Sequence, residues 1–577
     1  MFARLFPDLA AYRPAFLGRD FIAALAVSFL AVPQGIAYAM IAGLDPAIGL
    51  YAGAIPTIIA SLVRSSTHVM SGPTNAVSLL VGTAVAASAT DDPTTAALLL
   101  ATMVGVIQIG AGVLKLGALV DYISTAVVAG YITGAATLIG IGQLKNLTGT
   151  DGESGAVYNQ VWTWISGLSE TNGWSIVIGL STAAAILLLR LIPKRPPAAI
   201  VVLGLGVLLS WLLALDQYGV RLIRDIAPVP VGLPPLTLPT TADLALMPGL
   251  LPIAAAAAVL SLVESSAVGR SIASRTGQRL SSDREFIGQG LSNLSAGFFG
   301  GYPVSGSLGR SALAERTGVK SRLAGVMAGL MMIIVLLFLG PAVDLTPVPT
   351  LAGLLLVLAW DLIDLKKIRA ILSGDLGDKV SFTATLIGTW VLSLDYAIYL
   401  GVALSVILFL RRARQLVTKE MVLHNGRFIE TNNEIGGGDF PAIRVMHVEG
   451  SLFFGAANEL RDALDDITAD PALQVLILRL KRTSGIDFTT ATVLEAVHTR
   501  LQSQGRHLFL VGLRPDTMTL LDRVGVADAL GRHHLYPSRP GWFAAMDEAL
   551  TDALVLVNDE DLEAATALQA YLVAREA

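Results

Sequence analysis

Two short motifs place small polar residues where an apolar helix would begin, in two distant parts of the chain. Residues 72–82 read GPTNAVSLLVG and residues 302–310 read YPVSGSLGR. The apolar run in the first motif is too short to span a membrane alone. A helix that begins inside a membrane protein presents unpaired backbone N–H groups and a positive dipole end, which suit an anion. Two interrupted helices in corresponding places of two halves therefore predict an anion site between them.

Two charged residues accompany these motifs. Arg310 ends the second one, and a charged side chain at membrane depth costs about 2.5–3.5 kcal/mol on insertion scales. Arg310 would either attract the anion or form a structural pair with a carboxylate or a helix end. Glu264 lies in an otherwise apolar segment, where burial disfavours the charged carboxylate. We expect Glu264 to take up a proton during transport, which would ease anion binding; the alternative is a purely structural ion pair with Arg310.

Further polar residues fit the same site. Gln34 follows Pro33, which removes a backbone hydrogen bond, so the Gln34 amide can face the pocket or bond to a neighbouring helix. Tyr38 lies four residues on, hence on the same helix face, where it either lines the pocket or packs. The residues that begin the two short helices would contact an oxyanion or act only as helix caps. These residues are Thr74, Asn75, Ser305 and Ser307.

The composition indicates a membrane protein with a soluble extension. Hydrophobic residues make up 53% of the 577 residues and charged residues only 15%, too few to cover the surface of a soluble protein. The apolar excess ends near Leu410, so the net charge of −5 averages two unlike parts. The chain has no cysteine, which excludes disulfides, thiolate metal sites and cysteine nucleophiles. We expect no cofactor, no metal and no nucleic-acid partner.

Apolar segments predict a helical membrane domain over residues 1–415, with fourteen helices. The first segment has no cleavage site and is interpreted as a retained span. Lysines and arginines concentrate in alternate connections, which places both termini in the cytoplasm; Arg221 and Arg224 are exceptions. A proline-rich loop between helices seven and eight divides two repeats, about 15–215 and 245–411. The expected helices are 20–40, 46–63, 73–87, 95–115, 122–144, 174–191, 198–213, 247–270, 285–300, 305–315, 322–339, 350–362, 379–393 and 397–410.

The remaining residues predict a small soluble domain. Residues 416–440 are polar and contain three consecutive glycines, as is typical of a linker. Residues 441–555 then alternate strand and helix patterns, which indicates an α/β domain large enough to bury its own core. Residues 556–577 are interpreted as a C-terminal tail of unassigned role.

Five motifs in order resemble the SulP anion transporters, known as sulfate permeases in plants and microbes and including prestin in animals. The soluble domain resembles a STAS domain, and the resemblance covers nearly the whole chain. It is the ordered set that is specific, because each motif alone is a weak signal. The motifs are residues 32–39 (VPQGIAYA), 45–51 (DPAIGLY), Gly72-Pro73, 262–265 (LVES) and 305–311 (SGSLGRS).

The resemblance implies a fold of seven helices plus an inverted repeat of seven, arranged as a core domain and a gate domain. It also implies a homodimer that moves the core past the gate like an elevator. Substrate would sit between the starts of helices three and ten, with helices one and eight lining the pocket. Some bicarbonate-transporting relatives use sodium and carry an aspartate about two turns after the helix-eight glutamate. Residues 265–273 hold no carboxylate here, so proton coupling or plain exchange is expected instead.

One STAS loop resembles the phosphorylated loop of anti-sigma-factor antagonists. Residues 485–490 read GIDFTT, and Thr489 matches the phosphorylated serine although the usual Asp-Ser-Ser-Gly is not kept. Asp487 is interpreted as a helix cap in preference to part of a phosphoswitch, and a cytoplasmic partner for this domain stays open. His447, His498 and His507 lack metal-site spacing and are interpreted as ordinary residues.

These observations favour a secondary active transporter in the inner (plasma) membrane, embedded in the lipid bilayer. Its substrate would be a small anion: sulfate by resemblance, with dicarboxylates and bicarbonate as alternatives, and H+ as the coupling ion. An uncoupled exchanger or channel is the second hypothesis. A STAS-based membrane signalling protein is the third, although a simple anchor needs no broken helices. The chain has no Walker motif, which argues against an ATP-driven pump, and no enzymatic role is expected.

Overall fold

Prolines and capping side chains mark where many helices begin in the computed structural model. Pro46 and Pro93 occupy the first turns of their helices, where a missing N–H costs nothing, and Asp92 accepts a hydrogen bond from the backbone N of Thr94. The structure describes residues 12–88, 92–118, 123–150, 157–192, 198–229, 231–238, 240, 243–392, 394–424, 427–431, 442–541, 543–557, 566 and 568–573. The chain divides into two compact units, Met1–Val406 and Ile407–Ala577.

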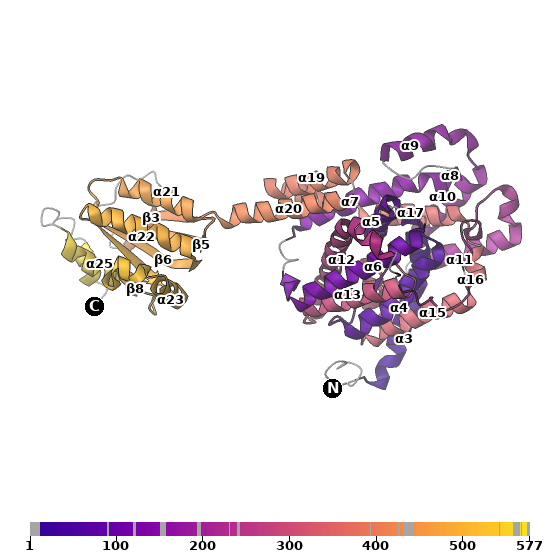
Figure 1. Cartoon of the computed structure of the whole chain (residues 1–577), viewed down its shortest axis with the longest axis horizontal. Coiled ribbons are helices and arrows are strands. Elements are labelled where there is room, and N and C mark those ends of the chain that lie inside the picture. The colour runs from indigo at the N-terminus through magenta and orange to yellow at the C-terminus, as the bar shows by residue number, and fades with distance from the viewer. Residues whose placement is uncertain are drawn as a thin grey trace. The chain divides into compact units, whose positions relative to one another are not determined.

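The first unit is helical (Figure 1). Each of the fourteen predicted helices overlaps a helix of the structure, the last of which continues past Val406 into the second unit. These helices are α3 (Leu17–Ile41), α4 (Pro46–Val63), α5 (Asn75–Ala87), α6 (Pro93–Val113), α7 (Thr125–Gly142), α10 (Gly173–Leu189), α11 (Ala198–Leu213), α12 (Met247–Thr276), α13 (Ser282–Phe298), α14 (Leu308–Arg316), α15 (Leu323–Phe338), α17 (Val348–Leu362), α19 (Leu376–Val391) and α20 (Leu394–Ala413). Among the described residues, seven helices are long and apolar enough to cross a membrane. The helical membrane fold is confirmed.

Several short helices were not predicted from the sequence. They are α8 (Leu144–Thr148), α9 (Val157–Ser166), α16 (Gly340–Asp344), α18 (Leu365–Ser373) and the 3-10 turns 14–16, 168–170, 215–218, 223–225 and 243–246. Most connect longer helices. They are short and of polar or mixed composition, so they lack the long apolar runs that predict membrane helices.

Contacts sort most of the long helices into two groups. In the first group, α13 packs on α6 and α4, α15 packs on α3 and α4, and α12 packs on α6. In the second group, α7 packs on α19 and α17, and α10 packs on α17 and α11. The first group carries α5 and α14, the two short helices that the motifs predicted.

The second unit is a six-stranded sheet with helices on both faces, in the order β4-β3-β5-β6-β7-β8. Strands β5 to β8 run parallel, and the β3–β4 hairpin adds antiparallel to β5. One apolar core lies under α21 to α24, and a second lies under α25 on the other face. The elements are β3 (Val417–His424), β4 (Arg427–Thr431), β5 (Ile443–Leu452), α21 (Ala457–Thr468), β6 (Val475–Ile486), α22 (Phe488–Ser503), β7 (His507–Leu513), α23 (Pro515–Arg523), α24 (Val526–Leu530), a 3-10 turn at 532–534, β8 (Leu535–Pro537) and α25 (Ala544–Leu556).

The structure corrects the predicted linker, 416–440. Strands β3 and β4 occupy most of its first half and belong to the sheet. Met421 and Leu423 are two residues apart on one face of β3, and both are buried in the core under α25. The three consecutive glycines lie outside the described residues.

The predicted tail, 556–577, is also wrong in part. Leu568 and Tyr571 pack in the same core as α25, and the Tyr571 hydroxyl donates to Asp547 Oδ1 at 3.1 Å. Within the described residues, the second unit therefore extends beyond both predicted limits of 441–555.

Candidate functional site

The candidate site lies where the two segments that lead into α5 and α14 pair with each other; this pair of segments is called the crossing below. Before α5 the chain forms β1 (Ser71–Gly72), and before α14 it forms β2 (Ser305–Gly306). The two pair antiparallel, with Ser71 opposite Gly306 and Gly72 opposite Ser305. The N of Ser307 donates to the Met70 carbonyl at 2.9 Å, which extends the pairing toward α14. Both short helices therefore begin next to one small strand pair, as the two motifs predicted.

Arg310 bridges the two short helices. Its side chain is only 2% exposed, and Nη2 donates to the carbonyl oxygen of Pro73 at 2.6 Å. Arg310 Nε is buried and has no hydrogen-bond partner. Gly72 makes this contact feasible, because it adopts φ +145° and a side chain there would collide with the guanidinium. Arg310 thus brings a positive charge, with donor capacity to spare, to the start of α5.

Glu264 of α12 faces the same crossing. It is partly buried, and its Oε2 accepts a hydrogen bond from the Thr74 hydroxyl at 3.1 Å. Thr74 is the N-cap of α5 but its side chain makes no capping bond, so its hydroxyl serves Glu264 instead. Glu264 and Arg310 interact electrostatically while each has its own hydrogen-bond partner. A carboxyl group and a guanidinium therefore flank the beginning of α5.

The other predicted residues divide into two kinds. Ser305 donates to the Ser261 carbonyl at 3.1 Å, and Ser307 caps α14 by accepting from the Arg310 N at 3.5 Å. The Asn75 Oδ1 accepts from the Ala76 N at 2.8 Å, so it is occupied by its own helix. Ser307 therefore acts as a helix cap and the Asn75 oxygen bonds within its own helix, whereas Ser305 ties β2 to α12.

Helix α3 contributes the two residues predicted to line the pocket. Gln34 is buried, and its Oε1 has no hydrogen-bond partner. Tyr38 is buried within electrostatic range of both Arg310 and Glu264. The structure thus brings Tyr38, Thr74, Glu264 and Arg310 together.

Two tyrosines near the crossing are absent from the residues predicted from the sequence. The Tyr302 hydroxyl lies 2.8 Å from Ser78 Oγ, which ties the second motif to α5. The Tyr131 hydroxyl of α7 is buried without a hydrogen-bond partner, within electrostatic range of Glu264. Tyr302 lies next to Pro303 in the second motif, which is a signal in the sequence for a site residue. The sequence around Tyr131 contains no such signal.

Strand β2 lies very close to α12. A side chain at Gly306 would come within 2.8 Å of Ser265 Oγ and 2.9 Å of its Cα. The Ser261 hydroxyl donates to the Val304 carbonyl at 3.0 Å. A residue without a side chain is therefore required at Gly306 by this approach of a strand to a helix.

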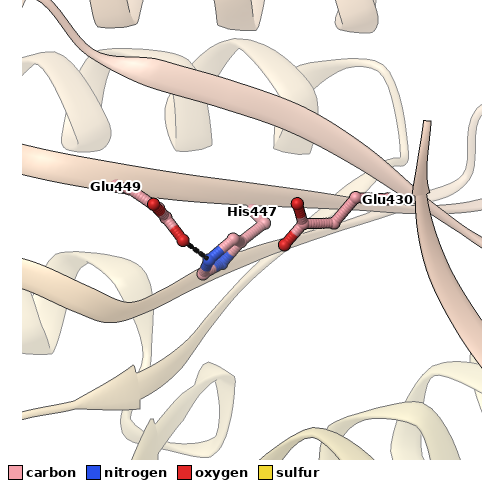
Figure 2. A group of neighbouring side chains, drawn as sticks. All are labelled: Glu430, His447 and Glu449. Carbon is pink, nitrogen blue, oxygen red and sulfur yellow. Dashed lines mark hydrogen bonds and ion pairs between the residues drawn. The ribbon is translucent and has the colours of Figure 1, made fainter. Parts of the chain in front are cut away.

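One group of side chains in the second unit has the composition of a metal site. Single ligand atoms of Glu430, His447 and Glu449 lie within 4.8 Å of one another (Figure 2). His447 Nδ1 lies 3.2 Å from Arg479 Nη1, which can only donate, so Nε2 carries the proton that bonds to Glu449 Oε1 at 3.0 Å. A protonated Nε2 cannot bind a metal, and this arrangement favours an ion-pair network.

The loop that resembles a phosphorylation site is held by Asp487. Its Oδ1 accepts from the Thr490 N at 2.9 Å and its Oδ2 from the Phe454 N at 2.6 Å. Asp487 is therefore the N-cap of α22, which agrees with the preferred interpretation. Thr489 is exposed.

The chain is similar to known membrane transporters over most of its length. The model of the Sulfate permease family matches residues 17–385, and that of the STAS domain matches residues 439–540. A probable sulfate transporter of Mycobacterium tuberculosis is 28% identical over 540 residues, which cover 92% of this chain and 95% of the relative. The sodium-independent sulfate anion transporter of Bos taurus is 28% identical over 549 residues, covering 89% and 86%.

The fold has a solved counterpart. The structure of the murine Solute Carrier 26 family member A9 anion transporter, in the inward-facing state, gives a TM-score of 0.85 at 20% identity and covers 96% of this chain and 94% of that chain. At this identity the likeness shows the fold alone.

Proposed function

The chain belongs to the sulfate permease family of membrane anion transporters, and on that premise we propose that it is a proton-coupled transporter of sulfate. The proposal is supported above all by the crossing of β1 and β2, which places the starts of α5 and α14 beside a buried arginine. An oxyanion there would accept hydrogen bonds from helix N-terminal N–H groups and from the guanidinium. Sulfate is the substrate in the names of both sequence relatives.

Proton coupling follows from the charges at the site. With Arg310 and Glu264 both ionised, the pair is neutral and attracts a dianion weakly. A proton on Glu264 leaves the arginine charge uncompensated, so that anion and proton bind best together. The Thr74 hydroxyl bonds to either form of the carboxyl group, because a hydroxyl can both donate and accept.

We further propose that transport proceeds by an elevator movement within a homodimer. The helix group that contains α3, α4, α6, α12, α13 and α15 carries the whole crossing, so it can move as one body against the group around α7 and α17. We also propose that the protein lies in the plasma membrane with both of its termini in the cytoplasm.

Uptake into proteoliposomes tests the proposal. Purified protein is supplied with labelled sulfate, fumarate, succinate, bicarbonate or chloride, at two pH values. We expect saturable sulfate uptake that is stimulated when the outside is acidic. Uptake of another anion in place of sulfate would overturn the substrate, and sulfate uptake indifferent to a proton gradient would favour the uncoupled exchanger or channel.

A further inference from the structure

Two buried side-chain amides of α13 form hydrogen bonds with the segments of the crossing. Gln289 and Asn293 lie one turn apart on this helix, and both side chains are fully buried. Asn293 pairs with the backbone of Val304 in both directions: Oδ1 accepts from the Val304 N at 2.6 Å, and Nδ2 donates to the Val304 carbonyl at 3.1 Å. The side-chain amide thus takes the place of a neighbouring strand for the residue just before β2.

Gln289 connects the two strands to each other. Its Nε2 donates to the Val304 carbonyl at 2.6 Å, beside β2. Its Oε1 accepts from the Ser71 hydroxyl at 3.1 Å, in β1. One side chain therefore touches both segments that lead into the short helices, and its length sets their relative position.

A third amide, that of Gln108, orients Asn293. Gln108 of α6 accepts from Asn293 Nδ2 at 2.8 Å and donates to the Ala258 carbonyl of α12 at 3.2 Å. These bonds fix which end of each amide is oxygen, because the Val304 N needs an acceptor while the carbonyls of Val304 and Ala258 need donors. The Ser71 hydroxyl then donates to the oxygen that Gln289 presents to it. A buried amide that loses a partner is costly, so the network tolerates only one arrangement.

We propose that Gln289 and Asn293 are positioning residues for the anion site, resting on the proposed function. They fix β1 against β2, and so set the separation between the starts of α5 and α14 and the reach of Arg310 to Pro73. Neither residue needs to touch the anion. Loss of the bridge would let the two helix ends shift, and anion affinity would fall while the fold persists.

The test compares Gln289→Met with Ser292→Ala. Methionine keeps the length of glutamine but neither of its hydrogen bonds. Ser292 is a matched control, since its buried hydroxyl on the same helix bonds to the Pro56 carbonyl of α4 and not to the crossing. Both variants of the full chain are assayed for KM and maximal rate with whichever anion the unmodified protein takes up, and for melting temperature.

We expect Gln289→Met to raise KM about tenfold, equivalent to the loss of one bridging interaction, with a nearly unchanged maximal rate. Ser292→Ala should leave KM within about twofold even if its melting temperature falls. An unchanged KM in Gln289→Met, or an equal rise in Ser292→Ala, would overturn the proposal. Should Gln289→Met fail to fold, Ser71→Ala removes only the strand-side bond and should raise KM about threefold.

A second readout does not depend on transport. Hydrogen exchange in peptides covering residues 69–76 and 302–309 should accelerate in Gln289→Met and not in Ser292→Ala. Unchanged exchange at both segments would contradict the positioning role even where transport is lost. Faster exchange in a protein that takes up none of the five anions would leave the positioning role standing and reject the proposed function alone.

Discussion

The guanidinium of Arg310, on α14, donates to the carbonyl oxygen of Pro73, two residues before α5 begins. A cation carried by one short helix therefore satisfies a backbone group at the entrance of the other. Because the fork of arginine has five N–H donors, one can hold Pro73 while others face an anion. This dual contact distinguishes the residue from a simple point charge.

Arg310→Lys tests that dual contact. Lysine keeps the charge but has a single compact head, so it cannot hold the Pro73 carbonyl and an oxyanion in the same geometry. We expect kcat/KM for sulfate to fall roughly a hundredfold, about 3 kcal/mol. Arg316→Lys at the exposed end of α14 is the control and should retain normal uptake. Comparable uptake by the two variants would show that charge alone suffices.

Glu264→Gln tests the coupling proposal. Glutamine preserves the hydrogen bond with Thr74 but cannot gain or lose a proton. We expect sulfate exchange to persist while stimulation by an inward proton gradient disappears. The measurement is initial uptake with and without that gradient in the same vesicles. Unaltered stimulation would remove Glu264 from the proton pathway.

The sequence was sufficient for the membrane helices, because spanning length and apolar content are local properties. It also located the two short helices, since proline followed by small polar residues is visible without a partner. It could not show that Thr74 would serve Glu264 in place of its own helix, because this choice depends on where α12 packs. Cap and ligand interpretations are equivalent until the neighbouring helix is placed.

The amides of α13 illustrate a different limit. Gln289 and Asn293 show the i, i+4 spacing of one helix face, yet polar residues at that spacing commonly face water. Their importance comes from Val304, which lies eleven residues beyond Asn293 and presents its backbone to them. Strands β3 and β4 were likewise not predicted from the sequence, because the run of polar residues 418–420 and the polar, glycine-containing segment that follows the hairpin indicate a linker.

Glycine packing between α6 and α13 predicts a contrast between two positions of one helix. A side chain at Gly105 would lie 2.6 Å from the Leu294 N and 2.8 Å from the Gly290 carbonyl oxygen, whereas Gly110 has no atom of another element within 4 Å. We expect Gly105→Ala to destabilise the protein by about 1–3 kcal/mol. Gly110→Ala should be neutral or stabilise it by roughly 0.5–1 kcal/mol through helix propensity. Thermal unfolding in detergent measures both, and equal melting temperatures would refute the close packing.

His447 predicts a pH dependence of the sheet domain. Burial lowers the pKa of His447 below its ordinary value, and the neighbouring Arg479 acts in the same direction, while Glu449 and Glu430 oppose them. The folded state therefore binds fewer protons than the unfolded state, whose histidine titrates near pH 6.5. Stability contributed by neutral His447 is present above about pH 6.5 and is lost as the pH falls toward its folded pKa.

His447→Gln should weaken this dependence. A glutamine amide can still donate to Glu449 and accept from Arg479, but it does not titrate. Hydrogen exchange of β5 and β6, corrected for the intrinsic rate, is compared in the full chain at about pH 7.5 and about pH 5.5. The loss of protection on acidification should be smaller in the variant. It should not vanish, because burial also lowers the pKa values of His498 and His534, which act in the same sense. Equal losses in both proteins would mean that His447 is protonated in the folded state and that the bond to Arg479 does not hold it neutral.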